Sequence, residues 1–155
     1  MSQGVIARRY AKALISLAEK GKELEKTGQH FSELAEAYKN SAELREALSD
    51  TKVSTERKQG VLKEILSKIK APALVDTFSR YLLAKRRIVL LPHIESAFNL
   101  LLQEKLGRIE ARVTVAHELP TATVEKLEKS ISGYSGKDVA ISITIDPAII
   151  GGIVT

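Results

Sequence analysis

Residues 101–115, LLQEKLGRIEARVTV, contain the point at which the pattern of the chain changes. Before Gly107, apolar residues recur every three or four positions, which is the spacing of an amphipathic α-helix. From Ile109 onward, apolar and polar residues alternate, as on a β-strand with one face in water. The sequence therefore predicts two domains, a helical one over 1–107 and one that contains strands over 108–155.

The first domain is expected to form six helices joined by short loops. Residues that interrupt helices, such as Gly21 and the pair Asn40-Ser41, separate the periodic segments, and Pro72 and Pro92 stand where a helix can begin. The expected ranges are 5–19, 23–39, 41–48, 54–69, 73–85 and 92–106. Six short helices with apolar stripes predict a six-helix bundle.

The second domain is expected to be a small α/β domain, so the predicted fold class is mainly α. A helix should follow Leu119-Pro120 and close at Gly133, and a second alternating strand should stop at Asp146-Pro147. The ending AIIGGIVT, residues 148–155, predicts entry into a third strand, with a bend at its glycine pair. Because so few elements bury little apolar surface, the domain is expected to be incomplete.

Composition argues against several classes of function. The chain has no cysteine, which removes disulfides and thiolate chemistry, and it has no apolar run near the roughly 18 residues that span a bilayer. It starts without a secretory signal, which favours a cytoplasmic setting. His30, His93 and His117 lie on different predicted elements, and no phosphate loop, nucleophile motif or carboxylate pair occurs. We therefore predict no enzyme and no catalytic, metal-binding or cofactor-binding residue.

Two basic clusters, Arg8-Arg9-Lys12 and Lys85-Arg86-Arg87, leave a second class of function open. The net charge is +5, and the excess lies in the first domain, with 19 Lys/Arg against 13 Asp/Glu. Such an excess can serve nucleic acid, an anionic membrane or an acidic protein. Nucleic-acid binders usually add a denser basic stripe and exposed aromatic side chains. The rim of a protein contact is favoured, and a nucleic-acid-binding adaptor is the alternative.

The first predicted helix is apolar over a wide arc. At about 100° per residue its apolar positions cover roughly 200°, about twice what a helix on one core needs. Two stripes share this arc, Ala7, Ala11, Leu14 and Ala18 on one side and Ile6, Tyr10, Ala13 and Leu17 on the other. The fifth predicted helix is also apolar nearly all round. Either both helices are central in the bundle, or they form a groove, rimmed by Arg9 and Lys85, for an amphipathic helix.

Four segments, in this order and spacing, resemble the delta subunit of bacterial F-type ATP synthase, the counterpart of the mitochondrial oligomycin-sensitivity-conferring protein. They are IARRYAKAL (6–14), LLAKRRIVLLPHIESAFNLLLQEKLG (82–107), RIEARVTVAHELP (108–120) and VAISITIDPAIIGGIVT (139–155). The resemblance covers the whole chain. Members of this family continue past the Gly-Gly strand into a hairpin and a final helix, so the chain is expected to be C-terminally truncated.

The resemblance implies a non-catalytic subunit of the peripheral stalk, or stator. Such a subunit ties the catalytic head to the stalk b subunits, so that proton flow through the membrane sector drives ATP synthesis. It implies one copy per complex at the cytoplasmic face of the bacterial cell membrane, with indirect membrane attachment and with no nucleic-acid partner and no cofactor.

The resemblance also implies where the partners bind. The N-terminal helix of an alpha subunit would lie between the first and fifth helices, and the C-terminal domain would meet the b subunits. Motif position assigns the alpha-subunit contact to Tyr10 and Ala13 on the first helix and to Phe78 and Leu82 on the fifth. Ile6 and Leu17 are added from the apolar stripe.

Overall fold

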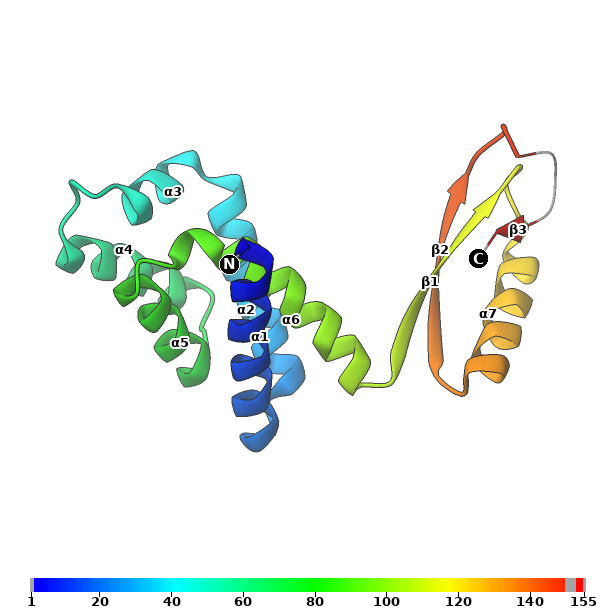
Figure 1. The fold of residues 1–155 in the computed structure, drawn as a ribbon, viewed down its shortest axis with the longest axis horizontal. Helices are drawn as coiled ribbons and strands as arrows, with labels where there is room; N and C mark the ends of the chain where they lie inside the picture. The colour runs from blue at the N-terminus through cyan, green and yellow to red at the C-terminus, as the bar shows by residue number, and fades with distance from the viewer. Residues whose placement is uncertain (1, 150–152, 155) are drawn as a thin grey trace. The chain divides into compact units, whose positions relative to one another are not determined.

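The structure is a computed structural model that describes residues 2–149 and 153–154, and it is mainly helical (Figure 1). The helices are α1 (Gln3–Lys20), α2 (Leu24–Asn40), α3 (Ala42–Ser49), α4 (Thr55–Lys68), α5 (Ala73–Ala84), the 3₁₀ helix η1 (Ile88–Leu90), α6 (Leu91–Lys105) and α7 (Thr121–Ser135). The strands are β1 (Arg108–Val115), β2 (Asp138–Ile145) and β3 (Ile153–Val154). Two compact units result, the helical unit Met1–Leu102 and the α/β unit Gln103–Thr155. The prediction of a mainly helical chain with a small sheet is confirmed.

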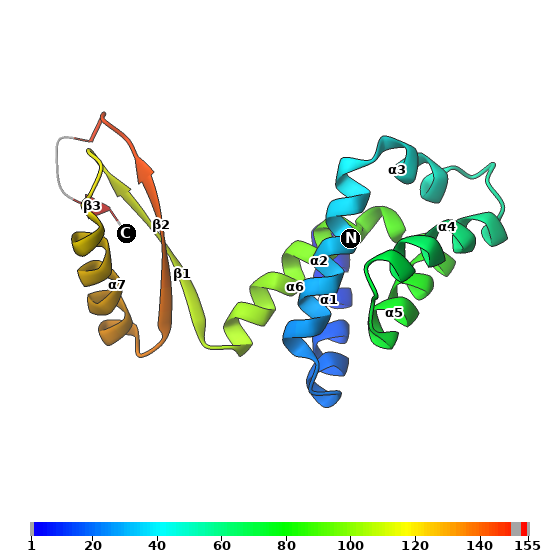
Figure 2. The ribbon, with the colours of Figure 1, turned by 180° about the vertical axis from the view of Figure 1, so that it is seen from behind.

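Each helix predicted before Gly107 is present, with both ends within two residues of the expected ones. The short helix η1 was not predicted, and it leads directly into α6. Helices α1 and α2 lie side by side and run in opposite directions, with α1 nearer the viewer in Figure 1 and α2 nearer in Figure 2. Serine side chains cap two of the helices: Ser41 Oγ accepts the Leu44 N–H at 3.1 Å, and Ser54 Oγ accepts the Arg57 N–H at 3.3 Å.

The core of the helical unit is apolar and contains three phenylalanine rings in contact, with Phe31 between Phe78 and Phe98. Side chains that are almost completely buried come from most of its helices: Leu14, Phe31, Leu34, Leu62, Val75, Leu82, Ile88, Leu91, Ile94 and Phe98. The ring centroid of Phe31 lies 5.7 Å from that of Phe78 and 6.2 Å from that of Phe98. Phe31 therefore joins α2 to α5 and to α6 through aromatic contacts.

Gly28, on α2, is a point of close approach to α6. A Cβ atom there would lie 2.8 Å from Leu102 Cδ2 and 3.2 Å from Phe98 Cε1, closer than ordinary van der Waals contact. We expect Gly28→Val to lower the free energy of unfolding of the helical unit by about 1–3 kcal/mol, the usual cost of overpacking a core. Urea denaturation followed by circular dichroism measures this change.

Gly60→Val is the matched control for this substitution. Gly60 lies within α4, where an added Cβ would have no neighbour within 4 Å. Valine has a higher helix propensity than glycine, so the free energy of unfolding should stay within about 0.5 kcal/mol of the parent or rise. Equal losses of stability at the two positions would contradict the close packing at Gly28.

The α/β unit is a three-stranded sheet with one helix. The strand order is β2-β1-β3, in which β1 pairs with β2 in parallel from Arg108↔Asp138 to Val115↔Ile145, and with β3 antiparallel. Helix α7 connects the two parallel strands and packs against β2. Val113 and Val115 of β1 are buried. The two alternating strands and the third strand are confirmed, and the bend predicted at Gly151-Gly152 lies outside the described residues.

Helix α7 does not close at Gly133, and this correction has a local cause. Gly133 lies inside the helix, and the helix ends at Gly136, which has a left-handed φ of 67°. The Gly136 N–H donates to the Ser132 carbonyl at 2.9 Å. A glycine can adopt the left-handed conformation that ends a helix without strain. The sequence has two such glycines here, and Gly136, not Gly133, adopts this conformation.

Candidate functional site

Helix α1 has two apolar stripes, and the structure confirms that they face different surroundings. The stripe of Ala7, Ala11, Leu14 and Ala18 is buried in the helical unit, with at most 1% of each residue exposed. In the other stripe, Ile6 and Tyr10 are half-buried and Ala13 and Leu17 are exposed, Leu17 by 50%. One side of α1 therefore packs the core, and the other side presents apolar atoms that the helical unit leaves open.

Helix α5 provides the facing side. Leu74, Thr77 and Tyr81, spaced by three and four residues, lie on the face that turns toward α1, together with the ring of Phe78. Val75, Ser79 and Leu82 lie on the opposite, buried face. Like α1, helix α5 packs the core with one face and leaves another open.

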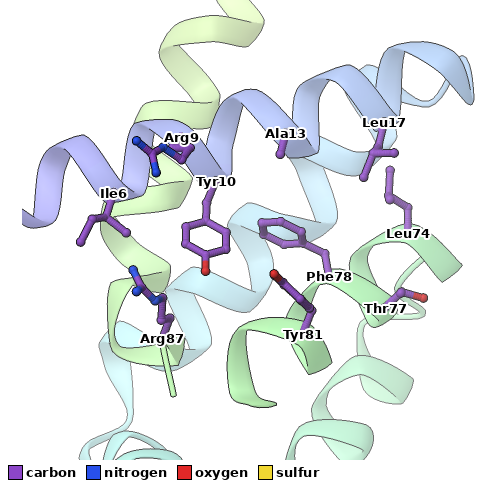
Figure 3. Close-up of a pocket in the computed structure, with 10 residues that line it drawn as sticks. All are labelled: Ile6, Arg9, Tyr10, Ala13, Leu17, Leu74, Thr77, Phe78, Tyr81 and Arg87. Carbon is purple, nitrogen blue, oxygen red and sulfur yellow. The ribbon is translucent and has the colours of Figure 1, made fainter. Parts of the chain in front are cut away.

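A groove of about 520 Å³ lies between the open faces of the two helices (Figure 3). It is lined by Ile6, Arg9, Tyr10, Ala13, Leu17, Leu74, Thr77, Phe78, Tyr81 and Arg87. Most of these side chains are apolar or aromatic. The lining contains no carboxylate, so the groove is an apolar surface with cationic and hydroxyl groups at its edges.

Tyr10 stands at the centre of the groove. Its ring centroid lies 6.3 Å from that of Phe78, in an edge-to-face arrangement, and 6.3 Å from that of Tyr81. Phe78 in turn contacts the core ring of Phe31. A continuous series of aromatic contacts thus runs from the core to the groove surface, and this packing fixes the shape of the groove.

The turn that follows α5 places Arg87 at the groove. Arg86 has a left-handed φ of 55°, and the Arg87 N–H donates to the Leu82 carbonyl at 2.8 Å. After this turn, Arg87 Cζ lies 5.7 Å from the ring centroid of Tyr10, and Lys85 Nζ lies 5.6 Å from that of Tyr81. Arg87 lines the groove and Lys85 does not, so the predicted rim of Arg9 and Lys85 is corrected to Arg9 and Arg87.

The acidic group nearest in sequence to the α5 side of the groove is already paired. Asp76 Oδ2 lies 3.0 Å from Arg80 Nε, one turn along α5, and neither residue lines the groove. The hydrogen bond from Arg80 to Asp76 raises the pKa of the Arg80 guanidinium. Because both charges are satisfied within α5, this pair leaves the charge at the groove to Arg9 and Arg87.

Five of the six predicted contact residues line the groove together: Ile6, Tyr10, Ala13, Leu17 and Phe78. Leu82 departs from the prediction. It is fully buried in the core and does not line the groove, because its position on α5 lies on the buried face with Val75 and Ser79. The positions that sequence reasoning missed are Leu74, Thr77, Tyr81 and Arg87. Leu74 and Tyr81 are spaced as i and i+7 on one face of α5, and this spacing could have predicted that both line the groove.

The described part of the chain offers no other chemistry of a recognisable kind. None of its helices is long and apolar enough to cross a membrane. Within the same residues, no three His, Asp or Glu side chains come together as metal ligands would. The open and mostly apolar groove between α1 and α5 is the candidate site.

The chain matches a known protein family over nearly its whole length. The family model described as "ATP synthase delta (OSCP) subunit" matches residues 6–155. The chain is similar to the ATP synthase subunit delta of Sinorhizobium medicae, at 32% identity over 96% of this chain and 79% of that protein. It is similar to the same subunit of Brucella ovis, at 33% identity over 96% and 80%. For the subunit of Geobacter metallireducens the values are 31% identity over 100% and 86%.

The fold has a counterpart among solved structures. A chain in the cryo-EM structure of the Toxoplasma gondii mitochondrial ATP synthase hexamer superposes with a TM-score of 0.72 at 23% identity, over 96% of this chain and 83% of that chain. At this identity the likeness shows the fold. The family match and the relatives above 30% identity show more: the chain belongs to the ATP synthase delta (OSCP) subunit family and is a structural, non-catalytic part of the ATP synthase.

Proposed function

We propose that this chain ties the catalytic head of a bacterial F-type ATP synthase to the peripheral-stalk b subunits, so that proton flow through the membrane sector drives ATP synthesis. In this proposal the helical unit is a six-helix bundle that binds the N-terminal helix of an alpha subunit. The α/β unit meets the b subunits. One copy serves each complex, at the cytoplasmic face of the cell membrane, and the other subunits hold it there. The observation that carries the alpha-subunit contact is the open groove between α1 and α5.

The length of the groove suits about three turns of a bound helix. Ile6 and Leu17 mark its two ends on α1, and eleven residues of helix rise by about 16 Å. Over that length an amphipathic helix presents about four apolar side chains, at i, i+3, i+4 and i+7. The aromatic and apolar lining matches such a stripe, and the polar face of the bound helix would remain in water.

The energetics favour a tether that has more than one attachment. Burying about four apolar side chains contributes on the order of 10 kcal/mol, and association costs about 4–15 kcal/mol in lost freedom. The groove alone should therefore give modest affinity. A second attachment, through the α/β unit, would make rebinding intramolecular and slow the overall dissociation. A subunit that must resist rotor torque has to stay bound, so it needs this slow dissociation.

Calorimetry with a synthetic peptide tests the alpha-subunit contact. The peptide is the N-terminal segment of the alpha subunit from the same organism, titrated into the full chain. We expect one peptide to bind per chain, with a negative heat-capacity change because apolar surface is buried. A peptide of the same composition, with its apolar residues moved off a single stripe, is the matched control and should bind at least tenfold more weakly.

Two results would contradict this proposal. One is the absence of peptide binding by a folded chain that also fails to co-purify with the alpha and b subunits. The other is tight binding to DNA or RNA that falls steeply with salt and is lost on neutralising Lys85, Arg86 and Arg87, which would favour the nucleic-acid adaptor instead. A stalk tether should show neither behaviour.

A further inference from the structure

The two ends of the α1–α5 groove differ in charge. At one end, Ile6 lies with the guanidinium groups of Arg9 and Arg87, and at the other end Leu17 faces Leu74 (Figure 3). Arg87 is held against the ring of Tyr10, with Cζ 5.7 Å from its centroid. The groove is thus cationic at one end and neutral and apolar at the other.

The charged residues in the segments around the groove are also unevenly distributed. Residues 3–20 and 73–87, which carry α1 and α5 with the following turn, contain eight Lys or Arg against two Asp or Glu, and one of these two, Asp76, is paired with Arg80. Beyond the Leu17 end, the segment 19–23 holds two acidic and two basic residues, whose charges cancel. Helices α1 and α5 run in opposite directions along the groove, so their dipoles oppose each other at each end. Side-chain charge therefore sets the polarity of the groove.

We propose that the groove fixes the direction of its occupant by charge: the acidic end of the bound amphipathic helix lies over Arg9 and Arg87, and its uncharged end lies over Leu17 and Leu74. This inference rests on the proposed function, because it takes an amphipathic helix as the occupant. In the opposite direction, the carboxylates of that helix would lie over leucines and the two guanidinium groups would have no partner. Arg87 is already ordered on Tyr10, so it loses little side-chain freedom when it pairs with a carboxylate.

The absence of cysteine in the chain makes the direction directly measurable. Gln3→Cys and Lys20→Cys each introduce a single cysteine for a nitroxide label, three residues before Ile6 and three residues after Leu17, on exposed positions of α1. Two ¹⁵N-labelled peptides share one apolar stripe. One carries two glutamates in its first turn, and the other carries them in its last turn. Line broadening by each label reports which end of the peptide is near.

We expect the glutamate end of both peptides to be broadened by the label at position 3 and the other end by the label at position 20, so that the two peptides bind in opposite directions. Arg9→Gln with Arg87→Gln should remove this dependence and lower the affinity about five- to tenfold. Arg8→Gln with Lys12→Gln removes the same charge from residues of α1 that do not line the groove, and should preserve the direction.

Two outcomes overturn the inference in different ways. If both peptides bind in the same direction, or each binds in both directions, charge does not orient the occupant, and the groove still binds a helix. If neither peptide binds to the folded chain, the inference fails; the proposed function fails with it only where the alpha-subunit peptide does not bind either and the chain does not co-purify with the alpha and b subunits.

Discussion

Replacing Phe31 with alanine is expected to lower the free energy of unfolding of the helical unit by about 3–5 kcal/mol, the usual cost of deleting a buried phenylalanine ring. Phe31 is completely buried, and its ring contacts those of Phe78 on α5 and Phe98 on α6. Alanine would leave a cavity at the point where three helices meet. Because a domain of this size is stable by only about 5–15 kcal/mol, Phe31→Ala should bring the unit close to unfolding at 25 °C.

Urea denaturation followed by far-ultraviolet circular dichroism measures this loss, with the helical unit and the α/β unit fitted as separate transitions if two are seen. Tyr134→Ala is the matched control, since this aromatic side chain is 97% exposed and its removal should change stability by less than about 0.5 kcal/mol. A loss below 1 kcal/mol for Phe31→Ala would show that Phe31 is not a central contact of the core.

The same residue links the stability of the unit to its groove. The ring of Phe78 lines the groove and rests against Phe31 from the core side. A cavity behind Phe78 would allow its ring to move inward and would leave Tyr10 without its edge-to-face neighbour. The shape of the groove therefore depends on the packing of core residues, such as Phe31, that do not line it.

The sequence predicted the helices and the two-sided character of α1 because both depend on local periodicity. Gly21 and the caps at Ser41 and Ser54 mark helix ends in the sequence itself. In α1, the two stripes lie about 100° apart on the helix, so a two-sided helix could be predicted from periodicity, and packing decides that the stripe of Ala7, Ala11, Leu14 and Ala18 is the buried one.

The orientation of α5 could not be predicted in this way. It is apolar nearly all round, so its periodicity fits several orientations, and only packing against the core decides that Leu82 is buried while Tyr81 lines the groove. Arg87 was missed for a different reason. Its place in the groove depends on the left-handed turn at Arg86. Arginine rarely adopts this conformation, so the sequence does not predict the turn.

The family is that of a structural subunit, which agrees with the lack of an enzymatic motif in the sequence. A structural, non-catalytic subunit needs surfaces, and the polar groups that it orders serve packing and contacts. The basic clusters fit this view. Arg9 and Arg87 lie at the edge of an apolar groove, and Arg87 Cζ lies 5.7 Å from the ring centroid of Tyr10. Cations at the edge of an apolar surface are typical of the rim of a protein contact.

Tyr10→Asp is expected to weaken binding of the alpha-subunit peptide by more than tenfold, or about 1.4 kcal/mol, while leaving the helical unit folded. Tyr10 is half-buried and belongs to the open stripe of α1, so the core stripe that holds the helix in place is untouched. The substitution removes the ring that contacts Phe78 and Tyr81. It also places a carboxylate beneath the apolar stripe of the peptide, where losing water is costly.

Tyr10→Phe separates the ring from the charge, because it retains the aromatic contacts and removes only the hydroxyl group. Its affinity should stay within about twofold of the parent, since the aromatic packing contributes the larger share of this contact. Calorimetric titration of the peptide into the parent and both variants measures the affinities, and circular dichroism verifies that each chain is folded. Equal affinities for the parent and Tyr10→Asp would mean that the peptide binds elsewhere. A loss confined to Tyr10→Asp would place the apolar stripe of the alpha-subunit helix directly over the centre of the groove.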